Sequence, residues 1–445
     1  MSVPANLFGD PSNALLSFAW QPVQNVPATS GWHDVEFKGE TMGNKVAALE
    51  RQAITSAGMM SPALDGKRDS GGDPSWDTPN PDELAYILAA LMGKGAAPVT
   101  VEAGAYRHKL SRLESAVTFP SWMTARVWRN DGMAQRFHDV EFSSLEISFA
   151  AKALLNTTVK TVATVADYWD DAVKQGSGTG TAIPQIRGIS ALNFDASATA
   201  SNLWVKVTAT ASGTVTVKTK VGNATSYGSG TQVITRGVWT QLLDQAGIRI
   251  GDNATPVQIY YPASGSIDAA TPDEFKILWT RDQWAPVFAD PTQVVSEVYS
   301  RVYVNGIESE LQGGKLTITK PAEAMFGFGG QDARRTRTRG SQSVKLDFNR
   351  EYLDLRVRTL VETGAPFSVV LDLQSRAPLG TSGALNFGIK GVGLNLRSIN
   401  STTASATSKD KSDESISAAA YPSTDGTYPS DWTWEVLNSI PDLSV

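Results

Sequence analysis

The stretch NPDELAYILAALMG at residues 80–93 predicts a helix, and a similar stretch, NREYLDLRVRTLVETG, occurs at residues 349–364. In the first stretch, Asn80 suits a helix N-cap, Pro81 suits the first helical position, and Gly93 can end the helix with a positive φ. Glu83 follows three residues after the cap, as in a capping box. The apolar residues that share one helical face are Leu84, Ile87, Leu88 and Leu91.

The second stretch predicts a helix of the same kind. We expect Asn349 to cap it and Gly364 to end it. A Gly-rich charged loop and a short Ser-containing strand precede each helix, and β-rich sequence follows each one. A duplicated β unit with one helix suggests a subunit that contributes two equivalent wedges to a ring. The predicted apolar stripe of the second helix is Leu353, Val357, Leu360 and Val361.

Composition sets outer bounds on the protein class. The 445 residues are enough for two or three domains, and the formal net charge of -6 argues against a general nucleic-acid-binding surface. The absence of cysteine excludes disulfides, thiolate metal sites and a cysteine nucleophile. We find neither a signal-peptide pattern nor a long apolar run, so we expect a soluble protein assembled in a cytoplasm.

The predicted fold is mainly β, with three domains. A first repeat covers residues 1–175, a β-sandwich of jelly-roll or immunoglobulin-like type covers 183–284, and a second repeat covers 286–445. The sequence GSGTG at residues 176–180 has the composition of a flexible hinge. The polar residues 401–417 predict a mobile loop or the tip of a long hairpin.

The strand RFHDVEFSSLEISFAA changes phase along its length. Val140 and Phe142 share one alternation, whereas Leu145 and Ile147 share the other. One extra residue at Ser143 or Ser144 would reconcile them, so we predict a β-bulge there.

Catalytic and metal-binding patterns are weak. His33, His108 and His138 have no metal-ligand spacing, and the pair Asp170 and Asp171, with Asp10 or Asp73, has no second motif to support a glycosidase. We therefore expect no enzyme activity, no metal site and no cofactor.

Charged residues gather in the two loops that precede the helices. Three interpretations stay open for these residues: a solvated loop, contact with a loop of opposite charge on a neighbouring subunit, or contact with DNA. Contact between loops of opposite charge would fix the register of stacked rings. The residues concerned are Asp65, Lys67, Arg68, Asp69 and Asp73 in the first loop and Arg334, Arg335, Arg337 and Arg339 in the second.

Aromatic residues of the central module suggest either a sandwich core or a sugar-binding surface. Trp204 and Tyr260 fall on the opposite phase from their apolar neighbours, so they are the candidates for glycan contact.

Four stretches resemble the major tail tube proteins of long-tailed, siphovirus-like bacteriophages, in the type with two tube domains per subunit. The central residues 183–284 lie outside the resemblance and weakly resemble carbohydrate-binding jelly rolls. The four stretches are ERQAITSAGMMSPALDGKRDSGGDPSWDTPNPDELAYILAALMG, YRHKLSRLESAVTFPSWMTARVWRNDGMAQRFHDVEFSSLEISFAA, YVNGIESELQGGKLTITKPAEAMFGFGG and SQSVKLDFNREYLDLRVRTLVETGAPFSVVLDL.

This resemblance implies a structural virion protein. Three chains would form a ring with pseudo-sixfold symmetry, and stacked rings would form a tube that conducts DNA during ejection. The central sandwich would lie outside the ring. An acidic lumen would repel phosphates, and the candidates for its lining are Asp139, Glu141 and Glu146.

The same resemblance implies the partners and the location. The partners are other copies of the chain, a tape measure protein in the lumen during assembly, tail terminator and distal tail proteins, transient DNA and a host surface glycan, with no membrane. The location is the virion tail, assembled in the bacterial host cytoplasm. Two alternatives stay open: a glycan-binding adhesin or tail decoration protein, and a carbohydrate-active enzyme with an auxiliary module.

Overall fold

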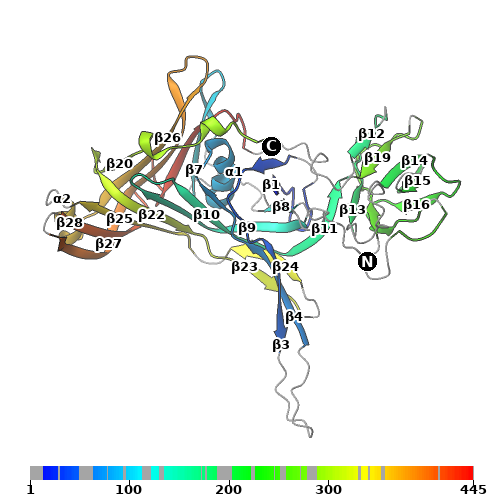
Figure 1. Cartoon of the computed structure of the whole chain (residues 1–445), viewed down its shortest axis with the longest axis horizontal. Helices are drawn as coiled ribbons and strands as arrows, with labels where there is room; N and C mark the ends of the chain where they lie inside the picture. The colour runs from blue at the N-terminus through cyan, green and yellow to red at the C-terminus, as the bar shows by residue number, and fades with distance from the viewer. Residues whose placement is uncertain are drawn as a thin grey trace, which may run out of the picture. The chain divides into compact units, whose positions relative to one another are not determined.

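The structure is a computed structural model in which strands dominate, so the prediction of a mainly β fold is confirmed (Figure 1). It describes residues 14–28, 31–49, 64–77, 79–93, 97–112, 122–129, 135–171, 173–175, 178–187, 203–221, 226–244, 246–250, 257–270, 272–277, 288–328, 332–338, 341–351, 356–408 and 411–443.

The chain divides into two compact units. Unit 1 combines residues 166–286 with 1–17 and 126–136, whereas unit 2 holds 18–125, 137–165 and 287–445. The predicted central sandwich falls within unit 1. Most of the two predicted outer domains lie together in unit 2, and no compact boundary divides them there.

Two sheets of unit 1 enclose a single core. Buried side chains such as Val205, Val217 and Phe275 from one sheet meet Ile259 and Ile186 from the other, as the sequence alternation predicts. One sheet has the order β12(Val173–Gln175), β19(Glu274–Ile277), β14(Leu203–Ala211), β15(Thr214–Val221) and β16(Gln232–Thr235). The other has the order β11(Val165–Asp171), β13(Gln185–Arg187), β18(Gln258–Tyr260) and β17(Thr240–Gln241).

The described glycines of the predicted hinge are held in place. Gly180 N donates to Asp273 Oδ1 over 3.2 Å, and the hydroxyl of Thr179 donates to Asp268 Oδ2 over 3.0 Å. A Cβ at Gly178 or Gly180 would lie within 2.3 Å of the Asp273 carboxylate. Glycine at positions 178 and 180 therefore permits a close approach to Asp273, whereas residues 176–177 of the predicted hinge lie outside the described residues.

One sheet of unit 2 runs through both repeats. Strands from residues 135–163 pair directly with strands from residues 311–420, so one hydrogen-bonded sheet contains strands of both repeats. The order is β10(Asn156–Ala163), β9(Gln135–Ala150), β22(Leu311–Thr319), β25(Ser343–Glu351), β28(Lys411–Ala420) and the end of β27(Leu385–Ser408). We call this sheet the junction sheet.

A second sheet of unit 2 also mixes the repeats, because β29 pairs with β7. The long strand β27 links the two sheets. Its residues 385–396 pair with β26, and its residues 396–408 pair with β28. The second sheet has the order β21(Ile307–Glu308), β20(Arg301–Val304), β26(Phe367–Leu379), β27, β29(Thr433–Asn438), β7(Ala105–Ser111) and β6(Val99–Glu102).

Helix α1(Pro81–Met92) matches its sequence signals. Asn80 Oδ1 accepts a hydrogen bond from Asp82 N, and Gly93 ends the helix with φ 89°. Nearly every side chain of α1 is buried, and the helix contacts β7 and β29. Glu83 is the exception to the capping box, because its carboxylate accepts from the backbone N–H of Glu36 instead of reaching back to the cap.

Helix α2(Arg356–Thr363) begins later than predicted. Asn349 does not cap it, because β25 continues to Glu351 with Val344, Leu346 and Phe348 buried in alternation. Asn349 Oδ1 instead accepts from the hydroxyl of Ser415 on β28. Gly364 follows the helix with φ 64°, as expected. The predicted stripe residue Leu353 lies outside the described residues.

The predicted bulge in β9 is confirmed. The register passes from Lys160 opposite Ser144 to Thr161 opposite Phe142, so Ser143 is the extra residue. The change of phase lets Phe142 and Leu145 both be buried.

The remaining elements are short strands and hairpins. β1 pairs with β2 and with β8, and the two 3₁₀ turns precede β20. The bounds are β1(Leu15–Trp20), β2(His33–Val35), β3(Gly43–Leu49), β4(Leu64–Gly72), β5(Ser75–Asp77), β8(Met123–Trp128), η3(Pro291–Gln293), η4(Glu297–Tyr299), β23(Ala322–Phe326) and β24(Ala333–Thr338).

Candidate assembly surfaces

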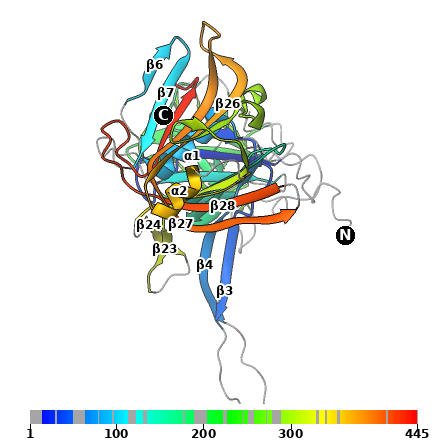
Figure 2. The ribbon, with the colours of Figure 1, turned by 90° about the vertical axis from the view of Figure 1, so that its left-hand side faces the viewer.

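Each repeat of unit 2 sends one hairpin to each end of the unit. Figures 1 and 2 place β3 and β4 at one end with β23 and β24 beside them, and β6, β7 and the β26–β27 turn at the other. The hairpins are also tied together in pairs. At the second end, the hydroxyl of Ser382 donates to Glu102 Oε1 over 3.0 Å, and Ala105 packs with Leu379 and Phe387.

The two repeats share one arrangement of the strand before the helix and the last hairpin. In the first repeat, β5 stands before the helix and pairs with β10, the second strand of the β9–β10 hairpin. In the second repeat, β25 stands before the helix and pairs with β28, the second strand of the β27–β28 hairpin. By this order β9 is the counterpart of β27, and each of them is the outer strand of its hairpin.

The outer edge of β9 is filled by β22 from the other repeat. The two strands are antiparallel over seven residue pairs, from Gly313 opposite Ala150 to Thr319 opposite Ser144. Their inward side chains are fully buried, among them Leu145, Ile147 and Ile318. The repeats are therefore fused by backbone hydrogen bonds together with a common apolar core.

Two glycines permit this close approach. A Cβ on Gly314 would lie 2.4 Å from Cζ of Phe149 and 2.8 Å from the carbonyl oxygen of Asp347. A Cβ on Gly313 would lie 3.2 Å from the carbonyl oxygen of Phe149. The sequence QGGK thus marks the place where the second repeat meets the first.

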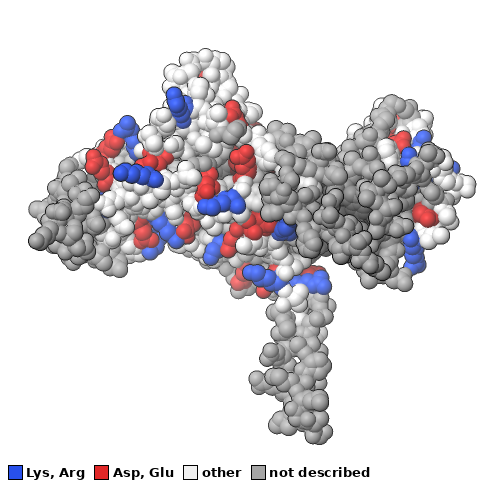
Figure 3. Space-filling model, viewed as in Figure 1, with Lys and Arg blue, Asp and Glu red and all other residues white. Residues whose placement is uncertain are grey.

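The opposite face of the junction sheet carries paired charges. Glu146 and Lys315 are joined across the β9–β22 junction at 2.6 Å, and Lys345 pairs with Asp347 at 3.0 Å. Figure 3 shows Lys and Arg side chains lying among Asp and Glu side chains on the visible face of the molecule. The described part of this face therefore carries lysines paired with acids, and Glu146, one of the predicted lining residues, is among them.

Asp139 and Glu141 are buried in this chain, so the prediction that they line a lumen is wrong. Asp139 is 0% exposed, and its carboxylate accepts from Gln21 Nε2 at 2.8 Å, from Asn25 N at 2.7 Å and from the Thr164 hydroxyl at 3.0 Å. These donors satisfy a buried charge that would otherwise be costly.

Glu141 anchors the hairpin β23–β24 to β9. Its carboxylate accepts from Trp122 Nε1 at 3.0 Å and from the hydroxyls of Thr336 at 2.8 Å and Thr338 at 2.7 Å. Burial lowers the pKa of nearby Lys320, although the Glu141 charge opposes that shift. Both predicted lining residues thus hold loops in place inside the subunit.

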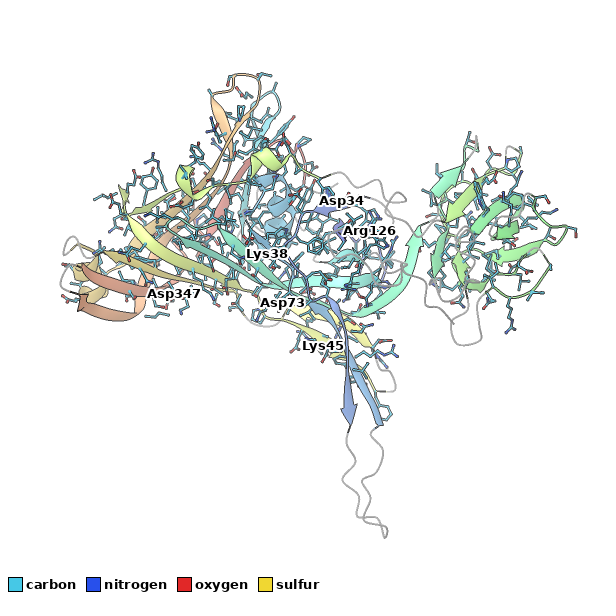
Figure 4. The ribbon with its side chains drawn as sticks, in the orientation of Figure 1. Asp34, Lys38, Lys45, Asp73, Arg126 and Asp347 are labelled. Carbon is cyan, nitrogen blue, oxygen red and sulfur yellow. The ribbon has the colours of Figure 1, made fainter. Side chains whose placement is uncertain are left out.

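The two charged loops contact each other within the same chain. Lys67 Nζ donates to the carbonyl oxygen of Gly327 at 2.8 Å, and Arg68 lies 3.7 Å from Asp332. Asp69 and Asp73 are exposed, and a hollow of about 420 Å³ opens beside them. Figure 4 shows Lys45, another lining residue, partway along β3 and Asp73 at its base.

Other predicted contact residues are exposed or lie outside the described residues. Arg334, Arg335 and Arg337 are exposed on β24, and Arg337 is directly opposite Glu323 on β23. The side chain of Asp65 and the whole of Arg339 lie outside the described part of the chain.

The outer edge of β27 differs from that of β9. Residues 397–408 pair with β28 on one side, and none of the strand pairings of the described residues fills the other side. Figure 2 shows β28 and β27 running along the side of the unit. The predicted hairpin at residues 401–417 is therefore present, and among the described residues no strand pairs with its outer backbone edge.

Sequence patterns did not reveal the apolar residues at the ends of the hairpins. Phe328 is fully exposed beside β23, and Val46 on β3 is more than half exposed. At the other end, Val99 and Val101 on β6 are exposed. Phe328, which stands between glycines in the sequence MFGFGG, is the signal that points to such a tip.

The two predicted glycan residues do not share a site. Trp204 lies on the outer face of β14, whereas Tyr260 lies on the outer face of β18 in the opposite sheet, where it packs against Trp239 at 5.3 Å. Both are half-buried.

The described residues contain no cluster of three or more His, Cys, Asp or Glu side chains placed to bind a metal. His33 stacks on Tyr86 at 3.5 Å, and His108 Nε2 lies 2.7 Å from the carbonyl oxygen of Ile440. Within the described ranges, we find no helix with the length and apolar character needed to span a membrane.

Comparison of the chain with known protein families and with curated proteins finds no match.

Proposed function

We propose that this chain is a structural subunit of a phage tail tube, in which three copies form a pseudo-hexameric ring and rings stack into a tube that conducts DNA. The proposal makes the chain a building block without catalytic activity or cofactor. It places the protein in the virion tail after assembly in the host cytoplasm.

The contrast between the two outer strands carries this proposal. β9 is covered by a strand from the other repeat, whereas the strand pairings of the described residues join residues 399–408 of β27 to a strand on one side only. If equivalent edges receive equivalent strands, the edge of β27 takes a strand from the first repeat of a neighbouring copy. The counterpart of β22 in that repeat is the segment from His33 to Gly39, which also precedes a long hairpin and bonds to the strand before the helix.

A ring built this way has a definite order. Junctions within a chain would alternate with junctions between chains, and three chains would supply six repeats. Pairing of the open edge would also remove a surface that otherwise promotes aggregation.

The hairpin ends support stacking of one ring on the next. Each copy presents hairpins of both repeats at each end of unit 2, with exposed apolar residues such as Phe328 and Val99. Exposed apolar side chains gathered at both ends are typical of an interaction surface. The exposed arginines of β24 and the exposed Asp69 and Asp73 would set the register between rings.

The face with Glu146 and Lys315 would line the bore. Its two described ion pairs leave little net charge on that surface. A surface of this kind holds phosphates weakly, because counterion release requires unpaired cations. DNA would then slide, as would a tape measure protein during assembly, while terminator and distal tail proteins would cap the tube ends.

Electron microscopy of the purified full chain tests the proposal. We expect rings or tubes with a central hole and threefold symmetry. A population that stays monomeric at every protein concentration, with the chain folded, would overturn it.

A further inference from the structure

The outer face of the five-stranded sheet in unit 1 concentrates lysines. Lys206 on β14 is directly opposite Lys218 on β15, and Trp204 is directly opposite Lys220. Like charges in directly opposed positions destabilise a sheet. Glu274 of β19 is directly opposite Lys206 on its other side, so the excess positive charge of this face falls mainly on Lys218 and Lys220.

Aromatic rings hold two of these lysines in place. The ammonium of Lys220 lies 4.4 Å from the centre of the Trp204 ring and 5.1 Å from that of Tyr227. Lys206 lies 5.7 Å from the centre of the same Tyr227 ring. A ring attracts an ammonium through its quadrupole and leaves the full positive charge available.

The acid on the described part of this face is already engaged. Tyr227 donates its hydroxyl hydrogen to Glu274 over 2.5 Å, which fixes the ring between the two lysines. Burial and the Glu274 charge raise the pKa of Tyr227, so it stays a donor at neutral pH. Lys218 has no ion pair with any described residue.

We infer that this face binds an acidic polysaccharide, whose carboxylates lie between Lys206, Lys218 and Lys220. Fixed ammonium groups lose little side-chain entropy when they bind an anion, because the rings already order them. Sugar hydroxyls can accept further hydrogen bonds from the lysines. The inference rests on the proposed function in one respect: a module outside a tail tube meets cell-surface polymers and not the DNA inside.

The geometry favours a glycan over a nucleic acid. Binding of single-stranded nucleic acid uses aromatic faces on which bases stack. Here an ammonium group lies over a face of Trp204 and over a face of Tyr227, so a stacking base would have to displace a lysine or use the other face of the ring. The net charge of -6 also disfavours long-range attraction of DNA to the chain.

The test measures binding of the full chain to four immobilised polymers at low salt. They are polygalacturonate as the acidic polysaccharide, dextran as a neutral one, polyphosphate as an anion without sugar, and duplex DNA. We expect polygalacturonate to bind more tightly than the other three and to be released as salt is raised.

Variants locate the site. Lys218→Gln should weaken polygalacturonate binding by about tenfold, and the triple variant Lys206→Gln, Lys218→Gln, Lys220→Gln should abolish it. Arg249→Gln is the control, because it removes an exposed positive charge from the same unit outside the five-stranded sheet. It should leave binding unchanged.

Four outcomes would overturn the inference. They are no binding of polygalacturonate, equal binding of dextran, equal or tighter binding of polyphosphate or DNA, and full binding by the triple variant. Electron microscopy of the same sample separates the two proposals. Tubes that do not bind polygalacturonate overturn this inference alone, whereas folded monomers that do bind it overturn the tube proposal alone.

Discussion

The β9–β10 and β27–β28 hairpins occupy equivalent places in the two repeats, yet only the first has its outer edge covered among the described residues. β22 fills the edge of β9 with seven residue pairs, and Gly313 and Gly314 make room for it. Residues 397–408 of β27 have a partner on one side. The pairing of β9 with β22 therefore indicates which kind of strand the outer edge of β27 should bind.

The largest effect should come from blocking the open edge. Backbone N–H groups of consecutive strand residues point to opposite sides, so of Ser401 and Thr402 one faces β28 and the other faces away. Proline removes that N–H. We expect one of the variants Ser401→Pro and Thr402→Pro to abolish tubes while its unfolding free energy stays within about 0.5 kcal/mol of the parent.

The other proline variant is the internal control, because it breaks a bond to β28 and should lower stability in a denaturation curve. If both variants formed normal tubes, the open edge would have no part in assembly.

The next effect tests the covered edge. Gly314→Val would place side-chain atoms against Phe149 and against the Asp347 carbonyl. We expect it to lower the unfolding free energy by about 3 kcal/mol or more, measured by chemical denaturation. Gly426→Val is the matched control, since no atom lies within 4 Å of a Cβ there. Equal stability of the two variants would contradict the described junction.

A smaller effect should follow from weakening the contact by which Glu141 anchors the hairpin β23–β24 to β9. Thr336→Val removes a donor to the buried Glu141 carboxylate. We expect a loss of about 2 kcal/mol, because a buried carboxylate loses a hydrogen bond. Thr100→Val on the exposed face of β6 should change stability by less than about 0.5 kcal/mol. Similar losses in both variants would argue against a buried anchor.

A pH dependence of the unfolding free energy should report on the burial of Glu83 in α1. Burial raises the pKa of Glu83 from its ordinary value of 4.5 to about 8. The folded state keeps a proton that the unfolded state releases, so stability should fall as pH rises from about 5 to 9. Glu83→Gln should flatten this slope and gain on the order of 2 kcal/mol at pH 9. An unchanged slope would contradict the burial of this carboxyl group.

Local features of the fold could be predicted from the sequence. Asn80, Pro81 and Gly93 act on their own helix, and the bulge at Ser143 follows from a change of phase in one strand. The prediction that Asn349 caps the second helix was wrong for a related reason. Its cap signal competes with the alternation of β25, and the alternation wins because β22 and β28 pair along its whole length.

Features of the candidate site were harder to predict, because distant residues create them. Asp139 and Glu141 read as surface acids until Gln21 and Thr336, more than a hundred residues away, bury them. Glu146 faces solvent and pairs with Lys315, which belongs to the other repeat. Whether a strand edge is open depends on which strands pair, and alternation alone does not contain that information.

The most direct test of the central claim is a cryo-electron microscopy map of the assembled protein at a resolution that traces strands. We expect residues 397–408 of each chain to pair with a strand from the first repeat of the next chain, in the way that β9 pairs with β22. A ring whose chains meet through other surfaces, with that edge still facing solvent, would contradict it.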